Sequence, residues 1–124
     1  MKLSDHLLDL ALPDPGRSRI VWSKLYGAAP SLAAAEAIAR HDGPVCVIAA
    51  SAAAAEQLER ELKFFNDGRQ TQRFTDYETL PYEPISPPQE LLSERLAILY
   101  RLANEQAIDL IVHADTLLQR LPPK

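Results

Sequence analysis

The chain has 124 residues, enough for one domain around a single hydrophobic core but not for two. Its 47% hydrophobic content excludes a disordered tail, and its formal net charge of -4 argues against a sequence-independent nucleic-acid surface, because such a surface needs clustered Lys and Arg. One cysteine excludes a disulfide framework, and no apolar run approaches the ~20 residues that span a bilayer, so we expect a soluble cytoplasmic location.

Two parts are expected along the chain: a lead-in helix and linker over residues 1–18, and one α/β domain over residues 19–124. The lead-in has leucines at helical spacing until Pro13, Pro15 and Gly16 interrupt it. The domain begins with a short β-type run over residues 19–23. A helix is predicted next over residues 31–41, with Ser31 as its N-cap and a glycine as its stop.

The middle of the chain alternates strand and helix. Residues 45–49 are continuously apolar, which predicts a strand buried on both faces, with Cys46 as a small buried hydrophobe. Residues 71–75 are a weaker strand candidate. Between these runs Ser51 starts a helix that closes at residues 66–68, and its apolar side chains fall on one face, at Ala55, Leu58, Leu62 and Phe65.

Residues 76–88 read DYETLPYEPISPP and form the most informative stretch of the sequence. Prolines at positions 81, 84, 87 and 88 fix φ and remove backbone donors, so the stretch can be neither a helix interior nor a central strand. We predict an extended, ordered loop. Tyr77, Leu80 and Tyr82 are expected to anchor this loop on the domain and not to stack on nucleic-acid bases, because their charged neighbours are acidic.

After this loop, Ser86 is expected to cap a helix and Gln89 to complete a capping box. The face of this helix is predicted to carry Leu92, Leu96 and Leu99, and the helix to end near residue 104. Residues 108–112 are predicted as another strand, and a last helix follows. Strands separated by helices predict a three-layer α/β fold with a mostly parallel sheet and helices on both faces.

The turn before the helix at 31–41 is the place where many α/β proteins bind phosphate. A working phosphate loop needs several glycines, a Lys and then a Ser or Thr at the helix start. Here the lysine and hydroxyl pair is absent, and a proline removes one amide. The turn is read as an ordinary tight turn or as a vestigial anion site at a helix N-terminus. Its residues are Gly27, Ala28, Ala29, Pro30, Ser31 and Leu32.

At the end of the last strand, His113 and Asp115 allow two interpretations. They could form an acid–base pair, but a capping Asp beside a partly exposed His is favoured, because no nucleophile or second acid accompanies them. We therefore predict no catalytic, cofactor-binding or metal-binding residues in this chain.

Four segments carry a resemblance to a known family: GPVCVIAAS at 43–51, DYETLPYEPISPP at 76–88, SERLAILYRL at 93–102 and DLIVHADTLLQRL at 109–121. In this order and spacing, the chain over residues 19–121 resembles the N-terminal region of bacterial transcription-repair coupling factors. The resemblance implies a RecA-like domain, the first half of a module shared with the UvrB excision helicase, with a degenerate phosphate loop over residues 27–32 and no cofactor.

The same resemblance implies that the chain is a fragment of an ATP-dependent DNA translocase. Its function would be that of a non-catalytic domain in the module that recruits excision repair, through UvrA, to stalled RNA polymerase. The expected partners are the inserted domain and motor of the coupling factor itself, and UvrA through the full N-terminal module, whereas RNA polymerase and DNA are contacted by other domains.

Two alternatives remain open. The chain could be a divergent P-loop nucleotide hydrolase that borrows a lysine such as Lys24, but the missing Lys and hydroxyl pair argues against this. It could also be a domain of the UvrB helicase that contacts DNA through its loops, but no long aromatic hairpin is inserted in the sequence.

Overall fold

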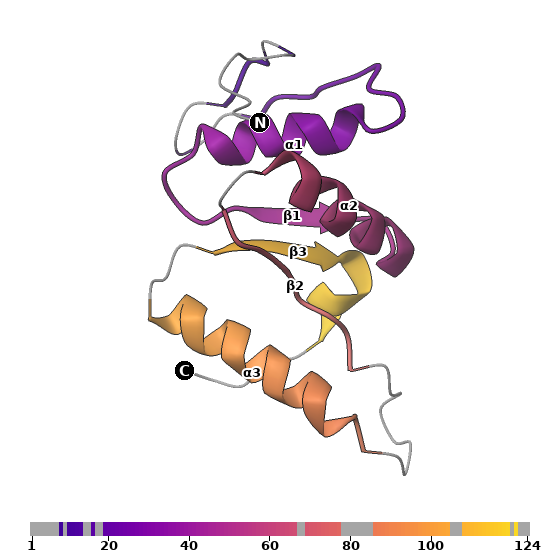
Figure 1. The fold of residues 1–124 in the computed structure, drawn as a ribbon, viewed down its shortest axis with the longest axis vertical. Coiled ribbons are helices and arrows are strands. Elements are labelled where there is room, and N and C mark those ends of the chain that lie inside the picture. The colour runs from indigo at the N-terminus through magenta and orange to yellow at the C-terminus, as the bar shows by residue number, and fades with distance from the viewer. Residues whose placement is uncertain are drawn as a thin grey trace.

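The computed structural model describes residues 8, 10–13, 16, 19–66, 69–77, 86–104, 108–119 and 121. These residues form three α-helices, three strands and a short 3-10 helix (Figure 1). In chain order the elements are α1 (Ala29–Ala39), β1 (Cys46–Ala49), α2 (Ala52–Phe65), β2 (Thr71–Arg73), α3 (Gln89–Ala103), β3 (Asp109–His113) and η1 (Ala114–Leu118).

The three strands form a parallel sheet in the order β1-β3-β2, so β3 lies in the middle. The register pairs Cys46 with Leu110 and Ala49 with His113, and it pairs Thr71 with Asp109 on the other side. In Figure 1, α1 and α2 lie on one side of the sheet and α3 on the other. The predicted three-layer α/β fold with a parallel sheet is therefore confirmed.

Each side of the sheet has its own hydrophobic cluster. On the side of α1 and α2, the buried residues are Ala35, Ile38, Ala55, Leu62 and Ile111. On the side of α3, they are Phe74, Ile98, Ile108 and Val112. Because successive strand residues point to opposite faces, neighbouring residues of β3 serve the two clusters in turn.

The prediction for α2 is confirmed in detail. The Ser51 hydroxyl accepts a hydrogen bond of 3.1 Å from the amide of Ala54, as an N-cap does. Of the predicted face, Ala55 and Leu62 are buried, and Leu58 and Phe65 pack against the same cluster. The strands predicted over 71–75 and 108–112 are confirmed as β2 and β3, each within two residues of its predicted bounds.

Three predicted helix caps are wrong. Helix α1 begins at Ala29, so Ser31 lies buried inside the first turn, where Pro30 costs no hydrogen bond because first-turn amides have no partner in the helix. Helix α3 begins directly after Pro88, and the Ser86 hydroxyl makes no cap. The last element is the 3-10 helix η1, whose N-cap is His113, with Asp115 inside its first turn.

The face predicted for α3 is only partly correct: Leu92 is half-buried and Leu99 packs on the core, but Leu96 does not. The buried side chains of this helix are Arg95 and Ile98, whereas Leu96 is 59% exposed. Leu99 and Leu102 pack at the edge of the cluster around Ile98. The residues that face the sheet are spaced as on one face of a helix, but one of them is an arginine. The pattern of apolar residues alone therefore does not identify this face.

The strand predicted over residues 19–23 is wrong as well. The structure has no strand there, and Val21 is 73% exposed, so this run lies outside the hydrophobic core. Lys24 follows with φ of 61°, a left-handed conformation that ends an extended segment. The lead-in predicted over residues 1–18 falls mostly outside the described residues, and residues 10–13 within it are not helical. No helix in the described ranges is long and apolar enough to cross a membrane.

Candidate functional site

The turn over residues 26–32 has the geometry of a tight connection. The amide of Ala29 donates to the carbonyl of Tyr26 at 3.1 Å, and Gly27 adopts φ of 60°. A Cβ built on Gly27 meets nothing within 4 Å, so the glycine serves the backbone conformation and leaves no cradle that a side chain would fill. Because residues 19–25, which precede it directly, form no strand, this turn also lacks the position at a strand end that phosphate loops occupy.

A carboxylate lies beside the first turn of α1. The hydroxyl of Ser31 donates to Glu61 of α2, and the Gln57 amide donates to the same carboxyl at 2.8 Å. These two hydrogen bonds, that of Ser31 first, lower the pKa of Glu61, so it is ionised at neutral pH. A negative charge here repels the phosphate that a helix N-terminus would otherwise attract.

The structure separates His113 from Asp115. His113 is buried, contrary to the expectation of partial exposure, and its ring nitrogens lie 3.0 and 3.1 Å from the hydroxyl of Thr116. Asp115 is exposed to solvent. The two side chains therefore have different surroundings and do not form a paired acid and base. Within the part of the chain that the structure describes, no group of three or more His, Cys, Asp or Glu could hold a metal ion.

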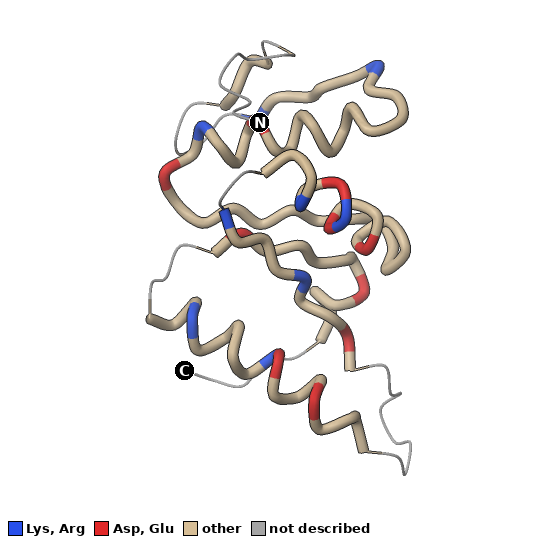
Figure 2. The backbone as a smooth tube through the Cα atoms, viewed as in Figure 1, with Lys and Arg blue, Asp and Glu red and all other residues tan. Residues whose placement is uncertain are grey.

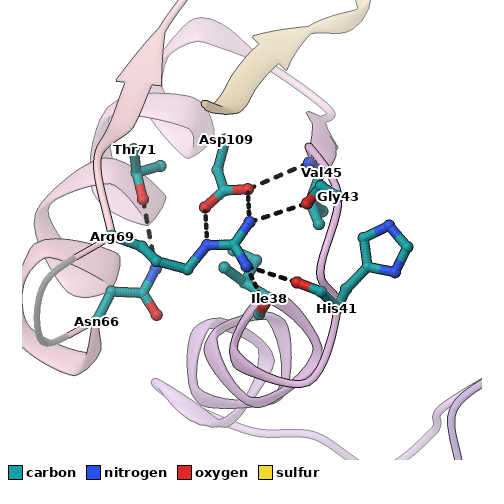
Figure 3. A network of polar contacts seen from close by, with 8 residues as sticks. All are labelled: Ile38, His41, Gly43, Val45, Asn66, Arg69, Thr71 and Asp109. Carbon is teal, nitrogen blue, oxygen red and sulfur yellow. Dashed lines mark hydrogen bonds and ion pairs between the residues drawn. The ribbon is translucent and has the colours of Figure 1, made fainter. Parts of the chain in front are cut away.

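Arg69 and Asp109 form a network at the amino ends of the strands, which the sequence analysis missed (Figure 3). The Nε and Nη2 atoms of Arg69 donate to the two carboxylate oxygens of Asp109 at 2.8 and 2.7 Å. Asp109 also accepts from the amide of Val45 at 3.1 Å. The remaining Arg69 bonds go to backbone carbonyls at the end of α1 and in the loop that follows it, those of Ile38, His41 and Gly43.

This network connects the end of α1 to the beginnings of β1, β2 and β3. A charged residue inside the apolar run of residues 108–112 was a signal for it, because an acid in a central strand needs a partner. Nothing in the sequence identified that partner as Arg69.

Charged residues are spread over the molecule (Figure 2). Both signs alternate along α2, where Glu56 pairs with Arg60 at 3.2 Å and Glu59 pairs with Lys63 at 2.9 Å. Burial raises the pKa of Glu59, but hydrogen bonds and charges from Lys63 and Arg73 outweigh burial and lower it overall. Among the described residues, Lys and Arg positions lie interspersed with Asp and Glu positions along the backbone (Figure 2) and form no stripe along one element, the arrangement that nucleic-acid backbones need.

Arg95 is the second arginine that the sequence analysis missed, and it is 2% exposed. Its Nη1 atom donates to the carbonyl of Thr75, and its Cζ lies 4.2 and 4.0 Å from the ring centroids of Phe74 and Tyr77. Two such cation–π contacts offset about 2 kcal/mol each when desolvated. Burial of an ion costs several kcal/mol even after relaxation, so the rings compensate for only part of it. The expectation that Tyr77 packs on the domain is met by this contact with α3, whereas Leu80 and Tyr82 lie outside the described residues.

One half of the sheet is bare on the side of α3. Cys46 and Ile48 of β1 pair in register with Leu110 and Val112, which lie on the α3 side, so all four side chains share that face. Cys46 is exposed and Ile48 is 60% exposed, contrary to the predicted burial of this strand on both faces. Helix α3 covers β2 and β3 but leaves β1 uncovered.

An apolar pocket of about 170 Å³ opens beside this half of the sheet. Its lining includes Cys46 of β1, Leu117 of η1 and Leu121, and both leucines are more than half exposed. We call the face formed by Cys46, Ile48, Leu117 and Leu121 the bare face. Parallel sheets are normally covered on both sides, so an apolar face left exposed by the described residues is a candidate packing surface.

The relatives found by comparison with known proteins all carry the same name. The chain is 41% identical over 112 residues, 90% of its length, to the transcription-repair-coupling factor of Escherichia coli K12. It is 33% identical over 109 residues, 88% of its length, to the protein of that name from Haemophilus influenzae, and 38% identical over 69 residues, 55% of its length, to the one from Rickettsia prowazekii. The chain spans about a tenth of the length of the relatives it matches. No protein-family model matches it.

Proposed function

This chain belongs to the transcription-repair-coupling factor family, and on that premise we propose that it is a non-catalytic structural domain whose bare face packs against another part of the same protein. The observation that carries the proposal is the exposure of Cys46 and Ile48 on an otherwise covered parallel sheet. Water contact with these side chains and with the leucines around the pocket is unfavourable, at about 25 cal/mol per Å² of apolar surface. The free energy gained when another part of the protein covers these side chains would hold the domain in place.

In this proposal residues 19–124 are the domain and residues 1–18 are a lead-in. The domain would belong to the module that resembles the UvrB helicase and that recruits UvrA to stalled RNA polymerase. The rest of the coupling factor would supply the ATP-driven motor and the contacts with polymerase and DNA. The family membership and the length of the relatives support this division of work.

The reactivity of Cys46 tests the packing of the bare face. The experiment uses the intact coupling factor and a small thiol reagent, with labelled peptides identified by mass spectrometry. Because Cys46 is exposed in the domain itself, the proposal expects strong protection in the intact native protein and full labelling after unfolding in guanidinium. A cysteine placed in an exposed loop, Ser23→Cys, serves as the control and should react in the native protein. Native labelling of Cys46 as fast as that of the control would contradict the proposal.

The non-catalytic assignment rests on the turn at Gly27 and on the nearby carboxylate of Glu61. Without a lysine and a magnesium-binding hydroxyl, and with a negative charge beside the helix start, the turn should not hold a nucleotide. Photolabelling of the intact protein with an azido-ATP should give no labelled peptide from residues 19–40, even where peptides of the motor are labelled. A labelled peptide that contains residues 27–32 would show that the turn binds nucleotide.

A further inference from the structure

The buried side chain of Arg95 has two donors without a partner among the described residues. Its Nε and Nη2 atoms make no hydrogen bond, although the residue is 2% exposed. The carbonyl of Thr75 accepts from Nη1, and the rings of Phe74 and Tyr77 contact the guanidinium. What remains is one edge of the group, the edge formed by Nε and Nη2. Buried polar groups in native proteins are nearly always paired, so this edge calls for an acceptor.

The same edge is occupied in the network of Arg69 and Asp109, in which the carboxylate is buried and the arginine is 30% exposed. Arg69 uses its Nε and Nη2 atoms to bind the two oxygens of Asp109, at 2.8 and 2.7 Å. In a planar guanidinium these two N–H groups point the same way and match a carboxylate side-on. Arg95 presents the same pair of donors without the anion.

We propose that the Nε and Nη2 edge of Arg95 is a binding site for a carboxylate, supplied by an Asp or Glu side chain of the coupling factor. A carboxylate fits better than water because it accepts from both donors at once and also neutralises the buried charge. Asp76, the described acid next to Tyr77 in sequence, makes no hydrogen bond with Arg95 in this structure: its Oδ1 atom accepts from the Gln119 amide and from the backbone amide of Tyr77. This pairing goes beyond the proposed function, since it assigns a ligand to a residue away from the bare face.

Bound in this way, the carboxylate would fix whatever segment carries it against α3 and the end of β2. Two sources have the same chemistry. One source is this chain, where Glu78 and Glu83 follow Tyr77 in the sequence but lie outside the described residues; the other is another part of the coupling factor.

A crystal structure of the intact coupling factor tests the site directly. Crystals should be grown without acetate, formate, sulfate or phosphate, so that only protein carboxylates are available. The expected result is a carboxylate with its oxygens within about 3.2 Å of both Nε and Nη2. Water or a backbone carbonyl at both atoms would overturn the proposal, and the identity of the acid distinguishes the two sources.

A double-mutant cycle in solution provides a second measurement. The acid found in the crystal is changed to its amide, as in Glu78→Gln or Glu83→Gln, in the parent and in the Arg95→Lys background. Lysine keeps the positive charge and can lie on the rings but lacks the fork. In the parent the amide change should raise the unfolding equilibrium constant about tenfold or more. In the Arg95→Lys background its effect should be several times smaller, and equal effects in both backgrounds would overturn the proposal.

Discussion

Asp109 occupies the first position of the central strand with 1% of its side chain exposed, where an unpaired charge would be costly. Arg69 satisfies both of its oxygens, and the amide of Val45 adds a third bond. Each remaining donor of the Arg69 guanidinium also has a carbonyl partner. A fully hydrogen-bonded ion pair whose carboxylate is buried stabilises the fold little more than an apolar pair would, but removal of the arginine leaves the buried charge uncompensated, which is costly.

The first prediction follows from this asymmetry. Replacing the arginine, Arg69→Met, leaves Asp109 buried without its counter-ion and should lower the free energy of unfolding by about 3–5 kcal/mol. Urea unfolding followed by circular dichroism measures the change. The control is Arg60→Met, which breaks the exposed pair with Glu56, 65% and 56% exposed, and should cost less than about 0.5 kcal/mol. Similar losses in the free energy of unfolding for the two variants would mean that the network at the strand ends contributes no more to stability than an exposed ion pair.

At the scale of single elements, the sequence predicted α2 correctly because its buried positions are all apolar and its cap is a serine. The face predicted for helix α3 was only partly correct, for the opposite reason. Its inward stripe runs through Arg95, Ile98, Leu99 and Leu102, so the position that starts it reads as polar. The burial of Arg95 depends on Phe74 and Tyr77, which come from a different part of the chain. Local periodicity carries no information about that contact.

The exposure of β1 has a similar explanation. A continuous apolar run predicts burial on both faces, and the sequence does not show which face a neighbouring element within this chain will cover. The candidate site was therefore predictable only in part. The degenerate turn at residues 27–32 could be found from its missing lysine, whereas the bare face and the unpartnered edge of Arg95 depend on tertiary packing.

A second prediction compares two residues of α3 that lie two positions apart in the sequence. Ile98 is buried with Phe74, Ile108 and Val112, so Ile98→Ala should lower the free energy of unfolding by about 2–5 kcal/mol. Leu96 is mostly exposed, and Leu96→Ala should change it by no more than about 0.5 kcal/mol. Thermal or urea unfolding of both variants measures the difference. Should Leu96→Ala be the more damaging change in the domain, the face assigned to α3 would be wrong.

At the scale of the whole molecule, the described residues form a sheet with one face covered by helices and the other face covered only in part. Helices α1 and α2 cover the first side along β1 and β3, and the network of Arg69 connects α1 to the three strand beginnings. On the second side, α3 covers β2 and β3 but does not reach β1. A domain with this shape gains stability from a neighbour, because apolar surface at the bare face is then removed from water.

The last prediction places a charge on that face. In the intact coupling factor, Ile48→Asp would bury a carboxylate on the face of β1 that Cys46 shares if the bare face is covered, which costs several kcal/mol. We therefore expect a lower melting temperature and faster cleavage of this region in limited proteolysis. The matched control is Phe64→Asp on α2, where the phenylalanine is 77% exposed, comparable with the 60% of Ile48, but lies outside the bare face. Since an aspartate at a solvent-facing position loses little hydration, the control should behave like the parent. Ile48→Asp melting together with Phe64→Asp and the parent would mean that the bare face remains open to water in the whole protein.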